Sequence, residues 1–185
     1  SFNEMRDNEK VINEIFINLY GLDNDFTSDV SEEEVSLTIS TQHDIIVSMM
    51  LYAVGCMFGR YSLNEEGLIY AGGKWDNSRY MIFDPDEDNI IPITDEEYFE
   101  DDMVSRFCDW LKIAFGTKEF DTNMDFIAKT LGNKRNTSRE SIRNYFLNDF
   151  FKDHCNTYSV NGSGKRPIYW LFDSGKQNGF KALIY

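Results

Sequence analysis

The chain of 185 residues has 32 acidic residues against 18 Lys and Arg, which gives a formal net charge of −14. This length fits one domain, with room for two lobes and a sizeable core. Apolar residues make up 42% of the chain and aromatic residues 15%, a composition that excludes a disordered protein. The acidic balance excludes nucleic-acid binding over the whole surface, because phosphate contacts need clustered Lys and Arg. A basic strip within an acidic domain stays open.

The first segment has apolar residues at helical spacing from Met5 to Leu19, followed by Gly21. This pattern predicts an amphipathic helix over residues 3–20, with the glycine just past its end. After a polar turn, strict alternation over residues 35–39 predicts a half-buried strand.

The next stretch, from Asp44 to Arg60, has fifteen residues without a formal charge between its two charged ends. A helix that is apolar on every side has to be surrounded by other elements. The stretch is too short for a membrane span, which needs about 20 apolar residues. Gly55 and Gly59 share a face and allow a neighbouring backbone to come close. We therefore expect a buried central helix, capped by Ser40 or Thr41.

Two short apolar runs, residues 67–71 and 80–83, are candidate strands on either side of a glycine-rich loop. Residues 84–102 then hold ten acids in nineteen positions. Within them, Thr94 and Glu97 form a capping-box pattern, which predicts the start of a helix that reaches Phe115.

Two further helices are expected after Gly116. The first ends at Leu131, before Gly132, and the second begins with a capping box at Thr137 and Glu140. The second helix is predicted to run on through Ile142, Phe146 and Phe150 to the segment that contains His154.

The last section is rich in β-formers, in residues 166–172 and 180–185, with turn-forming residues between them. This arrangement predicts a hairpin. The class is mainly α with small β elements (α+β), a helical domain around a buried central helix with a C-terminal β-hairpin. We expect a helical lobe with short strands and an acidic loop over residues 1–116, two further helices over 117–158 and the hairpin over 165–185. Because the sequence stops inside a β-like run, residues 1–185 are expected to be a single fragment of a larger protein.

An acidic repeat, Asp84-x-Asp86-x-Asp88, is similar to the start of a calcium-binding EF-hand loop. That loop also needs Gly at its sixth position and Glu at its twelfth, where this chain has Asn89 and Asp95. No helix is predicted to precede the repeat. The pattern favours a solvated acidic loop.

Two other motifs are incomplete. Residues 171–175 (LFDSG) are similar to an aspartic-protease signature, but Lys176 follows where a small residue is usual, and Asp, Ser and Gly are ordinary turn residues. Residues 162–165 (GSGK) lack the earlier Gly and the following Ser or Thr of a phosphate-binding loop.

Single His and Cys residues complete the inventory of reactive side chains. His43 and His154 have no partner at metal or triad spacing, so we expect structural roles. The three cysteines, Cys56, Cys108 and Cys155, fit neither a disulfide framework nor a zinc site and indicate a reducing cytoplasm. The sequence predicts no catalytic, cofactor-binding or metal-binding residue in this chain.

Basic residues cluster densely at one place, where a predicted helix begins. Phosphate suits a helix N-terminus that is flanked by such groups, so this cluster and the basic residues around the hairpin are candidate DNA contacts. The alternative, a solubilising face with local ion pairs, stays open. The candidates are Lys134, Arg135, Arg139, Arg143, Lys165, Arg166, Lys176 and Lys181.

Several long segments resemble one family when they are taken together and in order. They are residues 13–22 (NEIFINLYGL), 52–63 (YAVGCMFGRYSL), 67–73 (GLIYAGG), 90–95 (IIPITD), 98–102 (YFEDD), 166–172 (RPIYWLF) and 179–185 (GFKALIY). The family is that of the PglX-type adenine-specific DNA methyltransferases of BREX phage-defence systems, which are related to Type IIG restriction-modification enzymes. The resemblance implies a parent enzyme that transfers a methyl group from S-adenosylmethionine to adenine N6 of a flipped-out base.

The catalytic motif of this family, Asn/Asp-Pro-Pro-Tyr/Phe, does not occur in the chain, because Pro85, Pro92 and Pro167 are its three prolines and no two are adjacent. No glycine-rich strand-to-helix turn suits the cofactor either. The resemblance therefore implies a non-catalytic segment that braces the core and helps to hold DNA. The resemblance implies that the parent enzyme binds S-adenosylmethionine, double-stranded DNA and other BREX proteins. It also implies that the parent is cytoplasmic and not associated with a membrane.

Two alternatives to DNA holding stay open. The acidic segment 84–102 could recruit another defence-system component, which would make the chain an interaction module. A DNA mimic ranks lower, because the acids cluster in one stretch instead of following a phosphate-like path.

Overall fold

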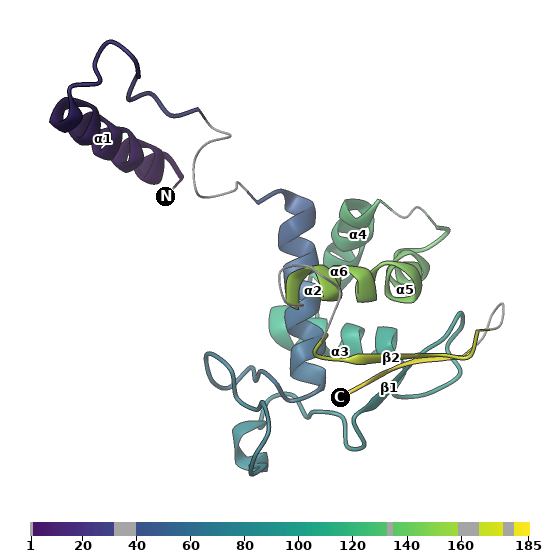
Figure 1. Cartoon of the computed structure of the whole chain (residues 1–185). Coiled ribbons are helices and arrows are strands. Elements are labelled where there is room, and N and C mark those ends of the chain that lie inside the picture. The colour runs from purple at the N-terminus through teal and green to yellow at the C-terminus, as the bar shows by residue number, and fades with distance from the viewer. Residues whose placement is uncertain (1, 32–39, 133–134, 159–166, 176–179) are drawn as a thin grey trace. The chain divides into compact units, whose positions relative to one another are not determined.

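The computed structural model describes residues 2–31, 40–132, 135–158, 167–175 and 180–185. The chain forms two compact units, Ser1–Thr41 and Gln42–Tyr185 (Figure 1). The lobe boundaries expected after residues 116 and 158 stay predictions.

The first unit contains α1 (Phe2–Tyr20), in agreement with the predicted amphipathic helix. Gly21 follows with a φ of +64°, the left-handed conformation expected just past a helix end. No residue of α1 is buried, and Lys10 forms an ion pair with Asp29 at 2.5 Å. The strand expected at 35–39 lies outside the described residues.

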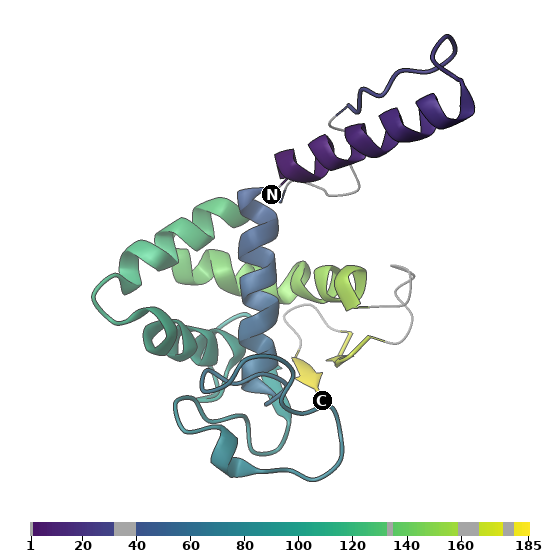
Figure 2. The ribbon, with the colours of Figure 1, turned by 90° about the vertical axis from the view of Figure 1, so that its left-hand side faces the viewer.

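The second unit is built around α2 (Gln42–Met57), the predicted central helix. Figures 1 and 2 show α3 (Met103–Phe115), α4 (Phe120–Leu131), α5 (Ser138–Asn148) and α6 (Phe150–Tyr158) around it. Burial of Met50, Leu51 and Cys56, which lie on different sides of α2, explains why this stretch contains no charge. The helix ends at Met57, because Gly59 adopts a φ of +68°.

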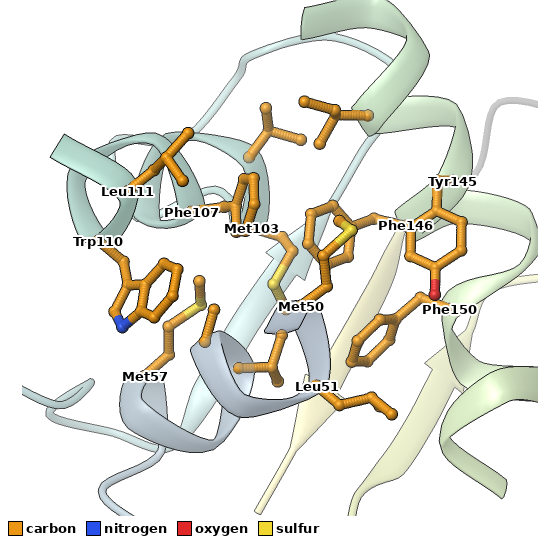
Figure 3. Packing of buried hydrophobic residues seen from close by; sticks show 14 of the residues in the cluster. Met50, Leu51, Met57, Met103, Phe107, Trp110, Leu111, Tyr145, Phe146 and Phe150 are labelled. Carbon is orange, nitrogen blue, oxygen red and sulfur yellow. The ribbon is translucent and has the colours of Figure 1, made fainter. Parts of the chain in front are cut away.

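Side chains of α2, α3, α5 and α6 meet in the core (Figure 3). Met50, Phe107, Phe146 and Phe150 are almost fully buried, and the Phe107 and Phe146 rings meet edge to face at 5.7 Å. Burying each of these phenylalanines contributes about 1.5–3 kcal/mol of stability.

The predicted start of α3 is wrong. Asp102 is the N-cap, and its carboxylate accepts hydrogen bonds from the amides of Val104 and Ser105 at 3.0 and 3.3 Å. Thr94 instead donates its hydroxyl to the carbonyl oxygen of Glu96 at 2.5 Å. The end of α3 agrees with the prediction, since Gly116 is its C-cap.

The segment predicted as one last helix is two helices. Thr137 caps α5 by accepting a hydrogen bond from the amide of Glu140 at 3.1 Å, as expected. The Glu140 carboxylate accepts from the amide of Asn136, one position before the cap residue that a capping box uses. The chain turns at Asp149, so Phe150 and His154 belong to α6.

The β part is a three-stranded antiparallel sheet in the order β1–β3–β2. The predicted hairpin is confirmed as β2 (Trp170–Asp173) paired with β3 (Lys181–Ile184). The sequence analysis missed β1 (Ile90–Ile93), which pairs with the other side of β3. Pro92 is tolerated there because β1 is an edge strand. The mainly α class with small β elements is therefore confirmed.

The strands expected at 67–71 and 80–83 are wrong, because both runs lie in an irregular connection that includes the short helix η1 (Asn77–Arg79). Side chains satisfy its backbone in place of a strand partner. The side-chain oxygen (Oδ1) of Asn64 accepts hydrogen bonds from the amides of Met81 and Ile82, both at 3.0 Å. Among the described residues, no helix is long and apolar enough to cross a membrane.

Candidate nucleic-acid interface

Arg143, the last residue of the basic cluster, is buried in an ion pair. Its guanidinium donates two parallel hydrogen bonds to the Asp102 carboxylate, Nη1 to Oδ2 at 2.6 Å and Nη2 to Oδ1 at 2.9 Å. Nη1 also donates to the carbonyl oxygen of Thr94 at 3.0 Å. The two side chains are 8% and 0% exposed. Arg143 therefore links α5 to the start of α3 and to the end of β1, and its buried side chain leaves little surface for a phosphate.

Arg139, one turn earlier, is partly exposed and also has an acidic partner. Its Nη2 lies 2.7 Å from Oε2 of Glu97 and 2.9 Å from the Ser105 hydroxyl. Its Nη1 lies 3.1 Å from the sulfur of Cys108. Hydrogen bonds from Arg139 and then Ser105 lower the pKa of Glu97, so this carboxyl group stays ionised and offsets the arginine charge.

Arg135 keeps its charge available. It is exposed, and its Nη2 donates to the side-chain oxygen of Asn144 at 2.5 Å. Within the described ranges, no carboxylate lies at ion-pair distance from its guanidinium. Its backbone amide is held by the Ser141 hydroxyl at 3.1 Å, close to the start of α5. Lys134 lies outside the described residues.

Of the candidate DNA contacts around the hairpin, Lys181 lies in the described part of the chain. Lys181 pairs with Asp173 across β3 and β2 at 3.2 Å and donates to the carbonyl oxygen of Leu147 at 3.1 Å. Lys165, Arg166 and Lys176 lie outside the described residues.

Some cations that the sequence analysis did not select are without a carboxylate partner in the part of the chain that the structure describes. They are spread along the sequence, so a search for local basic clusters could not find them. One signal was present, because Arg60 is the charged residue that ends the uncharged stretch of the central helix. These cations are Arg60, Lys74, Arg106, Lys129 and Lys152.

The acidic segment lines one side of a cavity of about 640 Å³, with Asp84, Asp86 and Glu87 among its residues. Aromatic residues also line this cavity, among them Trp75 stacked on Tyr80, with ring centroids 4.7 Å apart. Burial, followed by a hydrogen bond with Asp88, raises the pKa of Asp86.

The acidic repeat is folded back on the start of β1. The carboxylates of Asp86 and Asp88 both accept a hydrogen bond from the amide of Ile90, at 3.2 and 2.9 Å. Across the described residues, no three His, Cys, Asp or Glu side chains are grouped to hold a metal ion.

The remaining single residues have local structural contacts. Asp173 accepts a hydrogen bond from the amide of Gly175 at 2.8 Å, which is an Asx turn. His154 is fully buried, and its Nε2 accepts from the amides of Ile168 and Tyr169 at 3.1 and 3.3 Å. Burial, and then the charge of Arg60, lower the pKa of His154 to about 4, so the ring is neutral.

The fold defines a mainly helical segment with a small sheet, and comparison with known proteins finds two that are similar to it. The chain is 44% identical over its whole length to an adenine-specific methyltransferase, PglX, of Lacticaseibacillus casei (strain Zhang), and covers 15% of that protein. It is 38% identical over 169 residues, 83% of the chain, to the adenine-specific methyltransferase BrxX of Escherichia coli O9:H4 (strain HS), and covers 14% of it. No family model matches the chain. The chain therefore matches a segment of the PglX and BrxX adenine-specific methyltransferases of BREX type, and spans about one seventh of the length of these relatives.

Proposed function

We propose that the chain is a non-catalytic connecting segment of an adenine-N6 DNA methyltransferase, and that it braces the S-adenosylmethionine-dependent core and helps to hold DNA. The observation behind this proposal is the 44% identity to PglX over the whole chain, in which the catalytic Asn/Asp-Pro-Pro-Tyr/Phe motif does not occur. On this proposal the parent enzyme is cytoplasmic, and its other parts bind the cofactor and transfer the methyl group.

A bracing role is supported by the way the second unit is held together. Its central helix is buried among four others, and the Arg143–Asp102 pair fixes α5, α3 and β1 to one another. Such a buried, doubly hydrogen-bonded pair has one defined geometry, which suits a part that must position neighbouring domains.

A role in holding DNA is supported by Arg135. Its guanidinium is exposed and has no carboxylate at ion-pair distance among the described residues, although the chain has 32 acids. An unneutralised arginine near a helix N-terminus is suited to a backbone phosphate. Arg139 is a weaker candidate because Glu97 offsets its charge, and Arg143 leaves the candidate set because it is buried.

The test is a salt titration of DNA binding by the parent enzyme with the variant Arg135→Glu. Loss of one phosphate contact should reduce the slope of log affinity against log salt by about 0.9, and reversal of the charge by somewhat more. The control is Lys118→Glu, because Lys118 is 93% exposed and lies beside Glu119. An unchanged slope and affinity for Arg135→Glu would refute this DNA-holding role of the α5 start.

A second candidate function is docking of a basic partner, which the acidic and aromatic cavity favours. Asp84 and Glu87 line it and have no ion-pair partner among the described residues, whereas Glu97 and Asp102 of the same segment form ion pairs within the chain. The variant Asp84→Asn/Glu87→Gln should then abolish binding of another BREX protein while DNA binding persists. Retained binding of that protein would reject the docking role.

A further inference from the structure

Arg60 lies just past the end of α2, with its side chain against the end of β3. Its Nη1 donates a hydrogen bond to the phenolic oxygen of Tyr185 at 3.2 Å, and its guanidinium carbon lies 5.6 Å from the centroid of that ring. Its Nε is buried and has no hydrogen-bond partner in the described part of the chain. Arg60 is therefore a partly buried guanidinium with one hydrogen bond, to Tyr185, among the described residues.

No carboxylate of the described residues offsets this charge. None lies at ion-pair distance from Arg60 in this part of the chain, whereas Arg79, 19 residues further on, binds Glu65 at 2.5 Å. The titratable groups that its charge affects are His154, Tyr158 and Tyr169. The charge adds to burial in lowering the pKa of His154, which favours the neutral ring. It lowers the pKa of the two phenols, against the larger rise that burial causes. A guanidinium that has lost part of its hydration without a counter-ion is unfavourable in the isolated chain.

The position of Arg60 is rigidly defined. Its amide donates to the carbonyl oxygen of Gly55 at 2.8 Å, and its own carbonyl oxygen accepts from the amide of Ile69 at 2.8 Å. The turn before it depends on Gly59, which has a φ of +68° and leaves no room for a side chain beside Trp75. Tyr185 is held in turn, because its amide donates to the carbonyl oxygen of Asn89 at 3.1 Å. The donors are thus arranged before any ligand arrives.

We propose that the guanidinium of Arg60, supported by the hydroxyl of Tyr185, binds a phosphate of the DNA backbone. The chemistry fits, because the planar guanidinium offers paired N–H donors to two phosphate oxygens and a phenol adds a neutral donor. The hydroxyl of Tyr185 donates a long hydrogen bond, of 3.5 Å, to the carbonyl oxygen of Tyr70, and a phosphate oxygen would replace this acceptor. This site rests on the proposed DNA-holding function and adds a phosphate contact on the hairpin side of the second unit.

A first experiment uses the chain alone and inorganic phosphate. The buried Nε–H of Arg60 should give a protected side-chain resonance in a ¹H–¹⁵N spectrum, assigned by its loss in Arg60→Lys. Phosphate should shift this resonance and the backbone amide resonance of Tyr185. Sodium chloride at the same ionic strength should shift neither. Sodium acetate is the third arm, because a carboxylate from elsewhere in the parent would be the competing ligand. A shift with acetate and none with phosphate, or no shift with either, overturns the proposal.

The second experiment measures DNA affinity of the parent enzyme against salt for Arg60→Gln, Arg60→Lys and Tyr185→Phe. Arg60→Gln should lower affinity about tenfold near 0.1 M salt and reduce the salt slope by about 0.9, and Arg60→Lys should restore the slope. Arg79→Gln is the matched control, because its cation already has Glu65 as a partner. Circular dichroism melts verify that each variant is folded.

The outcomes separate the two proposals. If Arg60→Gln has no effect and Arg135→Glu does, the Arg60 site is rejected and the DNA-holding function stands. If neither variant alters the salt slope, both are rejected. If Arg60→Lys fails to restore the slope in a folded protein, the contact is not electrostatic and the phosphate site is rejected.

Discussion

Arg143 and Asp102 lie 41 positions apart in the sequence and share two hydrogen bonds in the interior, at 2.6 and 2.9 Å. The same carboxylate caps α3 through the amides of Val104 and Ser105. One carboxylate therefore satisfies both a buried guanidinium and a helix N-terminus, and its loss should affect three elements at once.

Breaking this pair from one side should be strongly destabilising. Arg143→Met should lower the free energy of unfolding by about 3–5 kcal/mol, because it leaves Asp102 as an uncompensated buried charge. The double variant Arg143→Met/Asp102→Leu should recover part of that loss, measured by urea denaturation. The control is Glu97→Gln at the partly exposed Arg139 pair, which should cost less than about 1 kcal/mol. A loss of similar size in both pairs would contradict a special role for the buried one.

This pair also shows what the sequence could and could not reveal. Helical periodicity and terminal glycines located α1, α2 and α4 well, because those signals are local. Asp102, the partner of Arg143, is far away in the sequence, so the sequence could not show that Arg143 is paired. The basic residues near Arg143 therefore indicated a phosphate-binding face, although Arg143 itself is buried. The strand β1 was missed for the same reason, since its partner β3 lies 90 residues later and an acidic context with Pro92 masked the β pattern.

The turn after α2 gives a test of packing against backbone strain. Gly59 and Gly67 both have positive φ, at +68° and +84°, but a Cβ atom at Gly59 would come within 2.3 Å of the Trp75 ring, whereas nothing lies within 4 Å at Gly67. Gly67→Ala should lower the free energy of unfolding by about 1–2 kcal/mol, the strain of placing a residue with a Cβ atom at positive φ. Gly59→Ala should cost about 1–3 kcal/mol more, because Trp75 has to move. Equal melting temperatures for the two variants would contradict the close contact between Gly59 and Trp75.

His154 should make stability depend on pH. Its folded-state pKa is about 4, below the ordinary value of 6.5, so as the pH falls the unfolded chain takes up the proton first. The contribution of the neutral ring is fully present above pH 6.5 and is lost as the pH falls toward 4. We expect protonation of His154 to lower the free energy of unfolding by about 2 kcal/mol between neutral pH and pH 4.

The matched variant is His154→Gln, in which an amide oxygen can still accept from the amides of Ile168 and Tyr169 but does not titrate in this range. Urea denaturation at pH 7 and pH 4.5 should show a smaller loss of stability on acidification for the variant than for the natural protein. Identical pH dependence would mean that His154 is not held neutral in the folded state.

The three cysteines should differ sharply in reactivity. Burial raises the pKa of Cys56 to about 11, and it also raises the pKa of Cys108, where the nearby Arg139 opposes the shift without cancelling it. Burial also raises the pKa of Cys155, but this thiol is partly exposed whereas the other two are buried. Since the thiolate is the reactive form, DTNB at pH 8 should label one thiol of the folded chain, and all three in denaturant. Cys155→Ser should abolish the native reaction. Rapid labelling of two or more thiols in the folded chain would show that the core around α2 and α3 opens more readily than its packing indicates.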